Sequence, residues 1–276
     1  MGLRHKIKQF WRFRQYFSSP ASWLRFSLMH IQGSLVPGGA AGEPGGDKRL
    51  VRLRVRGAGK PVVLRRHTTD YLVCREIFVD GEYDILLRYV RGEVRAIFDL
   101  GANIGLFTRF ALQNFPDARI AAVEPDPGNM QTCRENIHLS GRQSAVTLIE
   151  GCVAGSTRLV DLSHAGGEWA YKMVEASTDR PNHIAAMTIP QIAQAAGLAG
   201  EIDILKCDVE GAEQEIFANC AEWINRVRYL LVELHKPYSA EAFLADIRRS
   251  GAPLHVLESG PPDEPNVVLL LARAQT

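Results

Sequence analysis

Apolar runs alternate along the chain with amphipathic stretches, and this alternation predicts strands joined by helices. The first clear unit is an apolar run over 94–100, a loop of small residues, and an amphipathic helix over 104–115. A second apolar run, 119–124, and a helix ending near Leu139 repeat the unit. Repeated β-α-β units of this kind predict a mostly parallel sheet with helices on both faces.

Later apolar runs predict the remaining strands of this sheet. They cover 145–149, 202–208, 227–235, 254–257 and 267–271. Helices are expected from Pro190, after Glu213 and from Ala240, and the prolines before the last run allow it to enter as an antiparallel hairpin strand. The stretch 153–167 is expected to form short strands and turns, and 166–173 a loop.

The first thirty residues have a different character. They contain six Lys and Arg, no acid and seven aromatic residues, with apolar positions near helical spacing. A basic, aromatic helix of this kind fits peripheral contact with a membrane through residues 1–30. It also fits a helix that packs on its own domain or on a second subunit and exposes its basic face, and the pattern slightly favours this packing.

Composition shifts predict four segments. Residues 1–32 form the basic aromatic helical segment, 33–48 a Gly/Pro-rich flexible linker, 49–92 a flank of strands and helices, and 93–274 the main domain. Within the flank, short strands are expected over 50–55 and 61–64. Helices are expected over 83–90 and from Asp70, as its cap, to Phe78. These pieces are expected to form a lid or flank beside the loop 99–105.

The charge balance and the cysteines narrow the class of protein. Lys and Arg number 32 against 31 Asp and Glu, so bulk charge gives no reason to expect nucleic acid as a partner, and a small or neutral substrate is expected. The five cysteines are dispersed and include no Cys-x-x-Cys pair. This pattern predicts reduced thiols in a cytoplasmic protein. Arginines interrupt the N-terminal apolar region, which predicts no membrane span and at most contact with the inner face of a membrane.

The loop Asp99-Leu100-Gly101-Ala102-Asn103-Ile104-Gly105 is the first candidate for chemistry. Its glycines and Asn allow positive φ, and the following helix offers free backbone N–H groups to a ligand. Glu124 ends the next strand, where a carboxylate can accept hydrogen bonds from a ribose diol. The loop lacks Gly-x-Gly-x-x-Gly. A grip on an amino-acid-like tail is therefore expected rather than one on a pyrophosphate.

Polar residues at two later strand ends form the second candidate. Side chains two apart on a strand share a face, which pairs Lys206 with Asp208 and Glu233 with His235, and the pairs converge if the strands are neighbours. His235 is the preferred catalytic base because an unperturbed imidazole titrates at about 6.5. Asp208 would orient the imidazole or the acceptor, and Lys206 would offset the carboxylates or stabilise an alkoxide.

A structural alternative stays open for this second candidate. Lys206 would then pair with Glu233 or Glu210, and His235 would cap the sheet. The carboxylates and the imidazole are also potential metal ligands. No metal is predicted, because their spacing has no dedicated signature.

Four motifs in order resemble the FkbM family of S-adenosyl-L-methionine-dependent methyltransferases. They are 98–105 (FDLGANIG), 123–126 (VEPD), 202–213 (IDILKCDVEGAE) and 232–235 (VELH). The resemblance implies a class I (Rossmann-like) methyltransferase fold, an α/β sheet of seven strands with the last one antiparallel.

The resemblance also implies roles for individual residues. Asp99, Gly101, Asn103 and Gly105 would surround the methionine part of the cofactor, with Asp208 nearby, and Glu124 would hold the ribose. Glu150, Cys152 and Val153 would lie near the adenine. The sequence has Gly-Cys-Val-Ala-Gly over 151–155 where the family more often has Val-Ala-Leu-Ser-Asp, so this last set departs from the family pattern.

Members of the family typically methylate hydroxyl groups. The expected function is O-methylation of a sugar, a glycan or glycolipid, or another polar natural product, with a hydroxyl-bearing small molecule or glycan as substrate. The alternatives are an N-methyltransferase, which the missing Asn/Asp-Pro-Pro-aromatic tetrad disfavours, and a non-catalytic scaffold associated with a membrane. The acceptor pocket is expected from 50–91 and 162–180, where Trp169 and Tyr171 are candidates for stacking on a sugar ring. The acceptor and the oligomeric state are left open.

Overall fold

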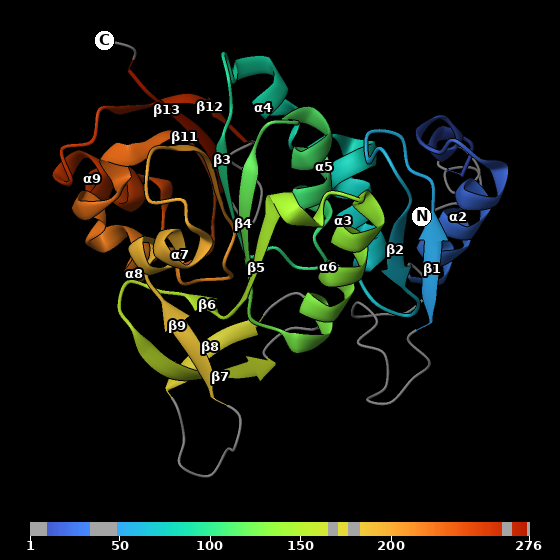
Figure 1. The fold of residues 1–276 in the computed structure, drawn as a ribbon, viewed down its shortest axis with the longest axis horizontal. Coiled ribbons are helices and arrows are strands. Elements are labelled where there is room, and N and C mark those ends of the chain that lie inside the picture. Colours follow the sequence, from blue (N-terminus) through green and yellow to red (C-terminus); the bar gives the residue numbers. More distant parts are fainter. Residues whose placement is uncertain (1–9, 34–48, 165–170, 176–182, 261–266, 275–276) are drawn as a thin grey trace.

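A seven-stranded sheet forms the centre of the fold (Figure 1), in a computed structural model that describes residues 10–33, 49–164, 171–175, 183–260 and 267–274. The strand order is β12-β13-β11-β10-β3-β4-β5, and all neighbours are parallel except β13, which is antiparallel to both β11 and β12. This confirms the predicted class I methyltransferase sheet. The strands are β3 (Ala96–Leu100), β4 (Arg119–Glu124), β5 (Val146–Glu150), β10 (Ile202–Cys207), β11 (Val227–Leu234), β12 (Leu254–Ser259) and β13 (Val267–Arg273).

Helices cover both faces of the sheet because successive strand residues point to opposite sides. Ile97 and Ile204 belong to one buried cluster, whereas Phe98 and Leu205 belong to the other. The first face packs against α3 (Asp70–Arg75), α4 (Asp84–Tyr89), α5 (Leu106–Asn114) and α6 (Pro127–Ser140). The second packs against α7 (Ile189–Ala196), α8 (Glu213–Ala218) and α9 (Ala240–Arg249). Short 3-10 turns cover Arg14–Tyr16, Gln143–Ala145, Cys220–Glu222 and Ile224–Arg226.

The N-terminal segment packs on its own chain. Helix α2 (Pro20–Gly33) lies beside the antiparallel hairpin of β1 (Leu50–Leu53) and β2 (Val62–Arg65), at one end of the molecule (Figure 1). Phe13, Phe17 and Phe26 are almost fully buried in this contact. Packing within the chain therefore accounts for three of the seven N-terminal aromatic residues, for which membrane contact and packing were both considered.

The flank continues from the hairpin through α3, a π-helical turn over Glu76–Asp80, and α4. Asp70 is the first residue of α3 but does not cap it, so the predicted cap is wrong. Its carboxylate instead accepts three hydrogen bonds from the backbone and guanidinium of Arg65, which satisfies both buried partners.

A second, four-stranded sheet lies below the carboxyl end of β5 in Figure 1, in the order β6-β9-β7-β8. Its strands are β6 (Cys152–Val153), β7 (Arg158–His164), β8 (Tyr171–Glu175) and β9 (Ile184–Met187). The loop predicted over 166–173 is wrong from Tyr171 onward, where β8 pairs with β7, and its earlier part, with Trp169, lies outside the described residues. Strand β9 was not predicted. Both strands are short, and among the described residues they pair with β7 and β6, which lie elsewhere in the chain, so local pattern did not identify them.

Candidate functional site

The loop after β3 has the conformation that its small residues allow. Gly101, Asn103 and Gly105 all have positive φ, at 79°, 49° and 78°. A Cβ on Gly101 would stand 1.8 Å from the backbone oxygen of Asp208, so this position requires glycine. The close approach brings the ends of β3 and β10 together at the point where the strand order reverses, which is where open α/β sheets bind ligands.

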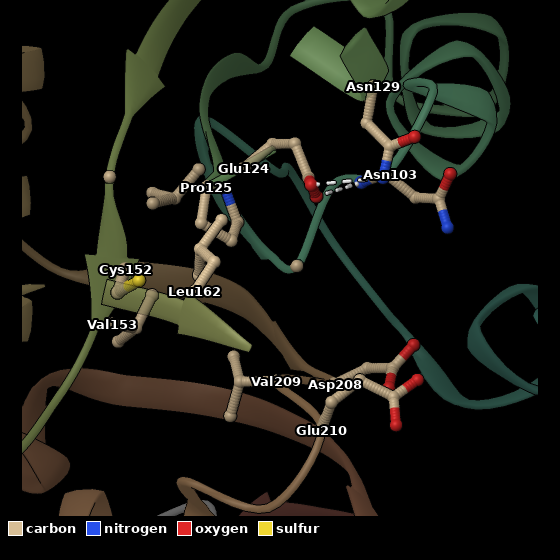
Figure 2. Close-up of a pocket in the computed structure, with 13 residues that line it drawn as sticks. Asn103, Glu124, Pro125, Asn129, Cys152, Val153, Leu162, Asp208, Val209 and Glu210 are labelled. Atoms are coloured by element: carbon tan, nitrogen blue, oxygen red, sulfur yellow. Dashed lines mark hydrogen bonds between the residues drawn. The ribbon is translucent and has the colours of Figure 1, made fainter. Parts of the chain in front are cut away.

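A pocket of about 590 Å³, including the open solvent at its mouth, lies at this edge. Figure 2 shows Cys152, Val153 and Leu162 at one side, and the carboxylates of Asp208 and Glu210 together at the other. The pocket is lined by Gly101, Asn103, Val123, Glu124, Pro125, Asn129, Gly151, Cys152, Val153, Leu162, Asp208, Val209 and Glu210.

Glu124 carries a buried carboxylate in the pocket wall. Its two oxygens accept hydrogen bonds from the Asn103 N–H at 2.8 Å (Figure 2), the Asp126 N–H at 3.0 Å and the Asn129 side-chain amide at 3.1 Å. Burial raises the pKa of Glu124 to about 7, and these three hydrogen bonds oppose the rise. A diol that donates further hydrogen bonds would stabilise the ionised form, so the residue fits a ribose.

A buried polar chain connects the flank to this carboxylate. Arg65 donates to the Asn129 side-chain oxygen at 2.7 Å, and the amide of Asn129 donates to Glu124. Asp126 caps α6 by accepting from the Asn129 N–H at 2.7 Å, which fixes the first turn of the helix. Asn129 was not foreseen as a site residue, although the Asp-Pro-x-Asn start of a helix is a readable capping pattern.

Lys206 lies beneath the loop rather than at its surface. The ammonium donates to the Gly101 carbonyl at 2.7 Å and lies 3.5 Å from Asp99 Oδ1 and 3.4 Å from Asp208 Oδ2. Burial alone would lower the pKa of Lys206, but the carboxylates of Asp208 and Asp99 raise it well above its usual range. Lys206 therefore stays charged and holds the loop in place. It forms ion pairs with Asp99 and Asp208, and the charge of Glu233, one of the partners considered from the sequence, also raises its pKa.

His235 lies among carboxylates from three directions. Its Nδ1 is 2.7 Å from Oε1 of the fully buried Glu213, and its Nε2 is 3.3 Å from Glu210 Oε2 and 3.7 Å from Glu233 Oε1. Burial lowers the pKa of His235, but the hydrogen bond to Glu213 and the charges of Glu213 and Glu210 raise it to about 9. The assumption that His235 titrates as an unperturbed imidazole is therefore wrong. The sequence alone could not show how many carboxylates surround this ring.

Two further carboxyls near this cluster titrate close to neutrality. Burial, with the charges of Asp208 and Glu233 among others, raises the pKa of Glu210 to about 7. Burial, followed by the charge of Glu233, raises the pKa of Glu82 to about 8. Glu82 comes from the flank between the π-helical turn and α4, and no sequence signal connected it to the strand ends. Burial first, and the neighbouring carboxylates second, therefore favour the protonated form of both groups.

The structure brings most of the predicted site residues together. Gly101, Asn103, Glu124, Cys152, Val153 and Asp208 line the pocket, and Lys206, Glu233 and His235 adjoin it through Asp208 and Glu210.

The structure places three of the predicted residues elsewhere. Asp99 is fully buried below the loop and accepts from the Thr108 hydroxyl at 2.5 Å. Gly105 faces Cys133, where a Cβ would meet the sulfur at 2.7 Å. The exposed side chain of Glu150 pairs with Arg134 at 3.0 Å, outside the pocket lining. In this structure each of these three residues therefore contacts neighbouring protein groups and does not line the pocket.

In the part of the chain that the structure describes, Asp208, Glu233 and His235 also form a group whose ligand atoms lie within 4.8 Å of one another. Two carboxylates and an imidazole suit a divalent cation. The same atoms form an ion-pair cluster, so the geometry is compatible with either arrangement.

Comparison with known proteins places the chain in a family. The family model described as "Methyltransferase FkbM domain" matches residues 99–255, which is more than half of the chain. The chain is similar to the 2-O-methyltransferase NoeI of Sinorhizobium fredii, at 27% identity over 154 residues that cover 50% of this chain and 62% of that protein. It is also similar to the 31-O-demethyl-FK506 methyltransferase FkbM of Streptomyces tacrolimicus, at 30% identity over 195 residues that cover 58% of this chain and 73% of that one.

Among solved structures, Aeropyrum pernix fibrillarin with bound S-adenosyl-L-methionine is similar, with a TM-score of 0.45 and 15% identity over 84% of this chain and 86% of that one. The aligned region spans less than two thirds of NoeI. Family membership rests on the domain match, and the observed sheet has the expected order. The chain belongs to the FkbM family of S-adenosylmethionine-dependent methyltransferases.

Proposed function

We propose that this methyltransferase transfers its methyl group to a hydroxyl of a sugar, a glycan or glycolipid, or another polar natural product. The carrying observation is the cluster of Asp208, Glu210, Glu233 and His235 where the pocket meets the ends of β10 and β11. An alcohol must lose its proton as it is methylated, so it requires a proton acceptor near the reacting oxygen. The cluster supplies such groups.

One observation shows that the residues of the pocket fit the cofactor. The buried Glu124 carboxylate lines the pocket with a pKa raised to about 7, so hydrogen bonds donated by a ribose diol would stabilise its ionised form. When bound, S-adenosylmethionine supplies an electrophilic methyl group on a sulfonium. The carboxylates of Asp208 and Glu210 favour a cation at their side of the pocket.

His235 and Glu210 are proposed to act together as the proton acceptor. Glu213 orients the imidazole through Nδ1 and leaves Nε2 toward Glu210, so the two side chains can share one proton. At neutral pH the His235 pKa of about 9 keeps the ring protonated, whereas the Glu210 pKa of about 7 leaves a carboxylate fraction. Asp208 and Glu233 would orient the acceptor hydroxyl.

Two relatives support an oxygen acceptor. The names of NoeI and of FkbM both describe O-methylation. The acceptor class of sugars and polar natural products comes from the family resemblance. The near-neutral carboxyls also disfavour a permanently anionic acceptor, because additional negative charge beside Asp208 and Glu210 would be repelled.

Methyl transfer from radiolabelled S-adenosylmethionine to a panel of free sugars, glycolipids, macrolides and amines tests the proposal. Label should enter the sugar or macrolide hydroxyls, and mass spectrometry of the product should place it on oxygen. Transfer to amines alone would overturn the oxygen assignment. His235→Gln should then lower kcat while cofactor affinity stays within a few-fold, and an unchanged kcat would remove His235 from proton transfer.

A further inference from the structure

The N-terminal quarter of the chain differs strongly in charge from the rest. Residues 1–66 contain fourteen Lys and Arg but only two acids, a net charge of +12, and the remaining residues carry −11. The near-zero net charge of the whole protein hides this division. The described part of the basic end is one structural unit, α2 with the β1-β2 hairpin. Such asymmetry points to a partner that is anionic.

Helix α2 is apolar on its outward face as well as on its inward face. Phe26 and Met29 point inward and are buried. Leu24 and Leu28, one turn apart, point outward and are 48% and 49% exposed. A helix at a protein surface normally presents polar side chains to water, so an apolar outer face needs its own cover.

An exposed tryptophan extends this apolar face. Trp11 is 62% exposed, and its ring lies 5.2 Å from that of Trp23, the neighbour of Leu24 on α2. Tryptophan is the side chain most suited to the boundary between lipid headgroups and hydrocarbon. We call Trp11, Leu24 and Leu28 the apolar face of α2.

Arginines adjoin the apolar face. Arg25 lies on α2 and donates to the Arg52 carbonyl at 3.3 Å, which places strand β1 alongside. Arg52 and Arg54 are exposed and alternate with the buried Leu53, so both point to solvent. Within the described ranges no carboxylate pairs with Arg25, Arg52 or Arg54, so their charges are available to a partner.

We propose that the apolar face of α2 and its adjoining arginines dock on the surface of an anionic membrane. Aliphatic side chains at the centre of the face require hydrocarbon, which a lipid surface offers and a nucleic acid does not. A second copy would bring a like basic surface against this one, which charge repulsion opposes in a symmetric interface. Among the described residues, no helix is long and apolar enough to cross a membrane.

Vesicle sedimentation of the full chain tests the docking. The wild type should pellet with phosphatidylcholine vesicles that contain about one third phosphatidylglycerol, and much less with phosphatidylcholine alone. The pair Leu24→Asp/Leu28→Asp should lower partitioning by about tenfold or more, and Arg52→Gln/Arg54→Gln by about tenfold on anionic vesicles only. The control Leu87→Asp/Leu159→Asp adds the same charge at two leucines of similar exposure elsewhere, and it should bind as the wild type does.

Two readouts separate the alternatives. Brominated lipid should quench the fluorescence of Trp11, and Trp11→Phe should remove that quenching. Affinity for S-adenosylmethionine should be unchanged in every variant, which shows that each one folds and that the outcome is independent of the acceptor. A wild type that stays in solution, or equal losses in the Leu24/Leu28 pair and its control, would overturn the proposal. So would heparin binding that matches vesicle binding in all variants, or a dimer that the Leu24/Leu28 pair dissociates.

Discussion

Replacing Lys206 by Met is the most informative single perturbation of the site. Methionine fills a similar volume but removes the ammonium that bonds the Gly101 carbonyl at 2.7 Å. It leaves Asp99, which is fully buried, and Asp208 without the cation that lies 3.5 Å and 3.4 Å from them. The loop loses its support, and a buried negative charge loses its partner.

The expected loss follows from the burial of the ion pair. Removing one partner of a buried pair typically costs about 3–5 kcal/mol of unfolding free energy, a large share of the roughly 5–15 kcal/mol of a typical domain. Burial already raises the pKa of Asp99, and Lys206 and Thr108 oppose the rise. Without Lys206 the pKa of Asp99 in the folded protein rises further. A group with such a raised pKa contributes stability below its unfolded pKa of about 3.9, and this contribution is lost as pH rises. The loss of unfolding free energy in Lys206→Met should therefore be larger at pH 8 than at pH 5.

Urea denaturation followed by circular dichroism at these two pH values measures the loss. Lys206→Met should lose about 3–5 kcal/mol at pH 8 and clearly less at pH 5, and should bind S-adenosylmethionine more weakly. Lys60→Met, at an exposed position, is the control and should change stability by less than about 0.5 kcal/mol. A loss below about 1 kcal/mol at pH 8, or an equal loss at both pH values, would refute the assignment of Lys206 as the buried counterion.

Three further predictions concern the same edge of the sheet. Because the pKa of His235 is raised to about 9, its contribution to stability is complete below about 6.5 and lost as pH rises through 9; urea titrations from pH 6 to 10 should show a decline that His235→Gln flattens. Because the pKa of Glu124 is about 7 and a bound ribose favours its ionised form, cofactor binding should release protons and become tighter from pH 6 to pH 8. Calorimetry in two buffers measures the proton release, and Glu124→Gln should abolish the share that comes from Glu124. A full proton release in that variant would contradict the role of Glu124 in binding ribose. Asn129→Leu removes a hydrogen bond to Glu124 and should weaken cofactor binding about tenfold, whereas Asn114→Leu, whose amide donates to the Phe110 carbonyl within α5, should not. Equal effects of the two substitutions would show that the polar chain from Arg65 to Glu124 has no special role.

Local pattern was sufficient for the central sheet. Each long strand is an apolar run between loops, so β3, β4 and β10 were placed within one or two residues of their observed bounds. Strands β8 and β9 were missed because their pairing depends on partners elsewhere in the chain, and the sequence nearby carries no strong alternation. The predicted cap at Asp70 failed for a related reason, since its carboxylate is satisfied by Arg65, which side-chain contact alone reveals.

The site divides in the same way. The sequence predicted the loop 99–105 and the polar strand ends, because glycines at positive φ and charges after apolar runs are set by backbone geometry and local burial. It could not show the contribution of Glu82, which the fold brings from the flank.

By itself, then, the sequence determined the strands of the central sheet, the conformation of the loop 99–105 and the family, since all three follow from short-range pattern. Only the tertiary structure decided what the charged groups do. It placed Lys206 beneath the loop and surrounded His235 with carboxylates. It also turned an apolar side of α2 outward, beside Arg25 and strand β1. Burial and proximity set the pKa of a group and the exposure of a face, and both depend on residues that the chain brings together from far apart.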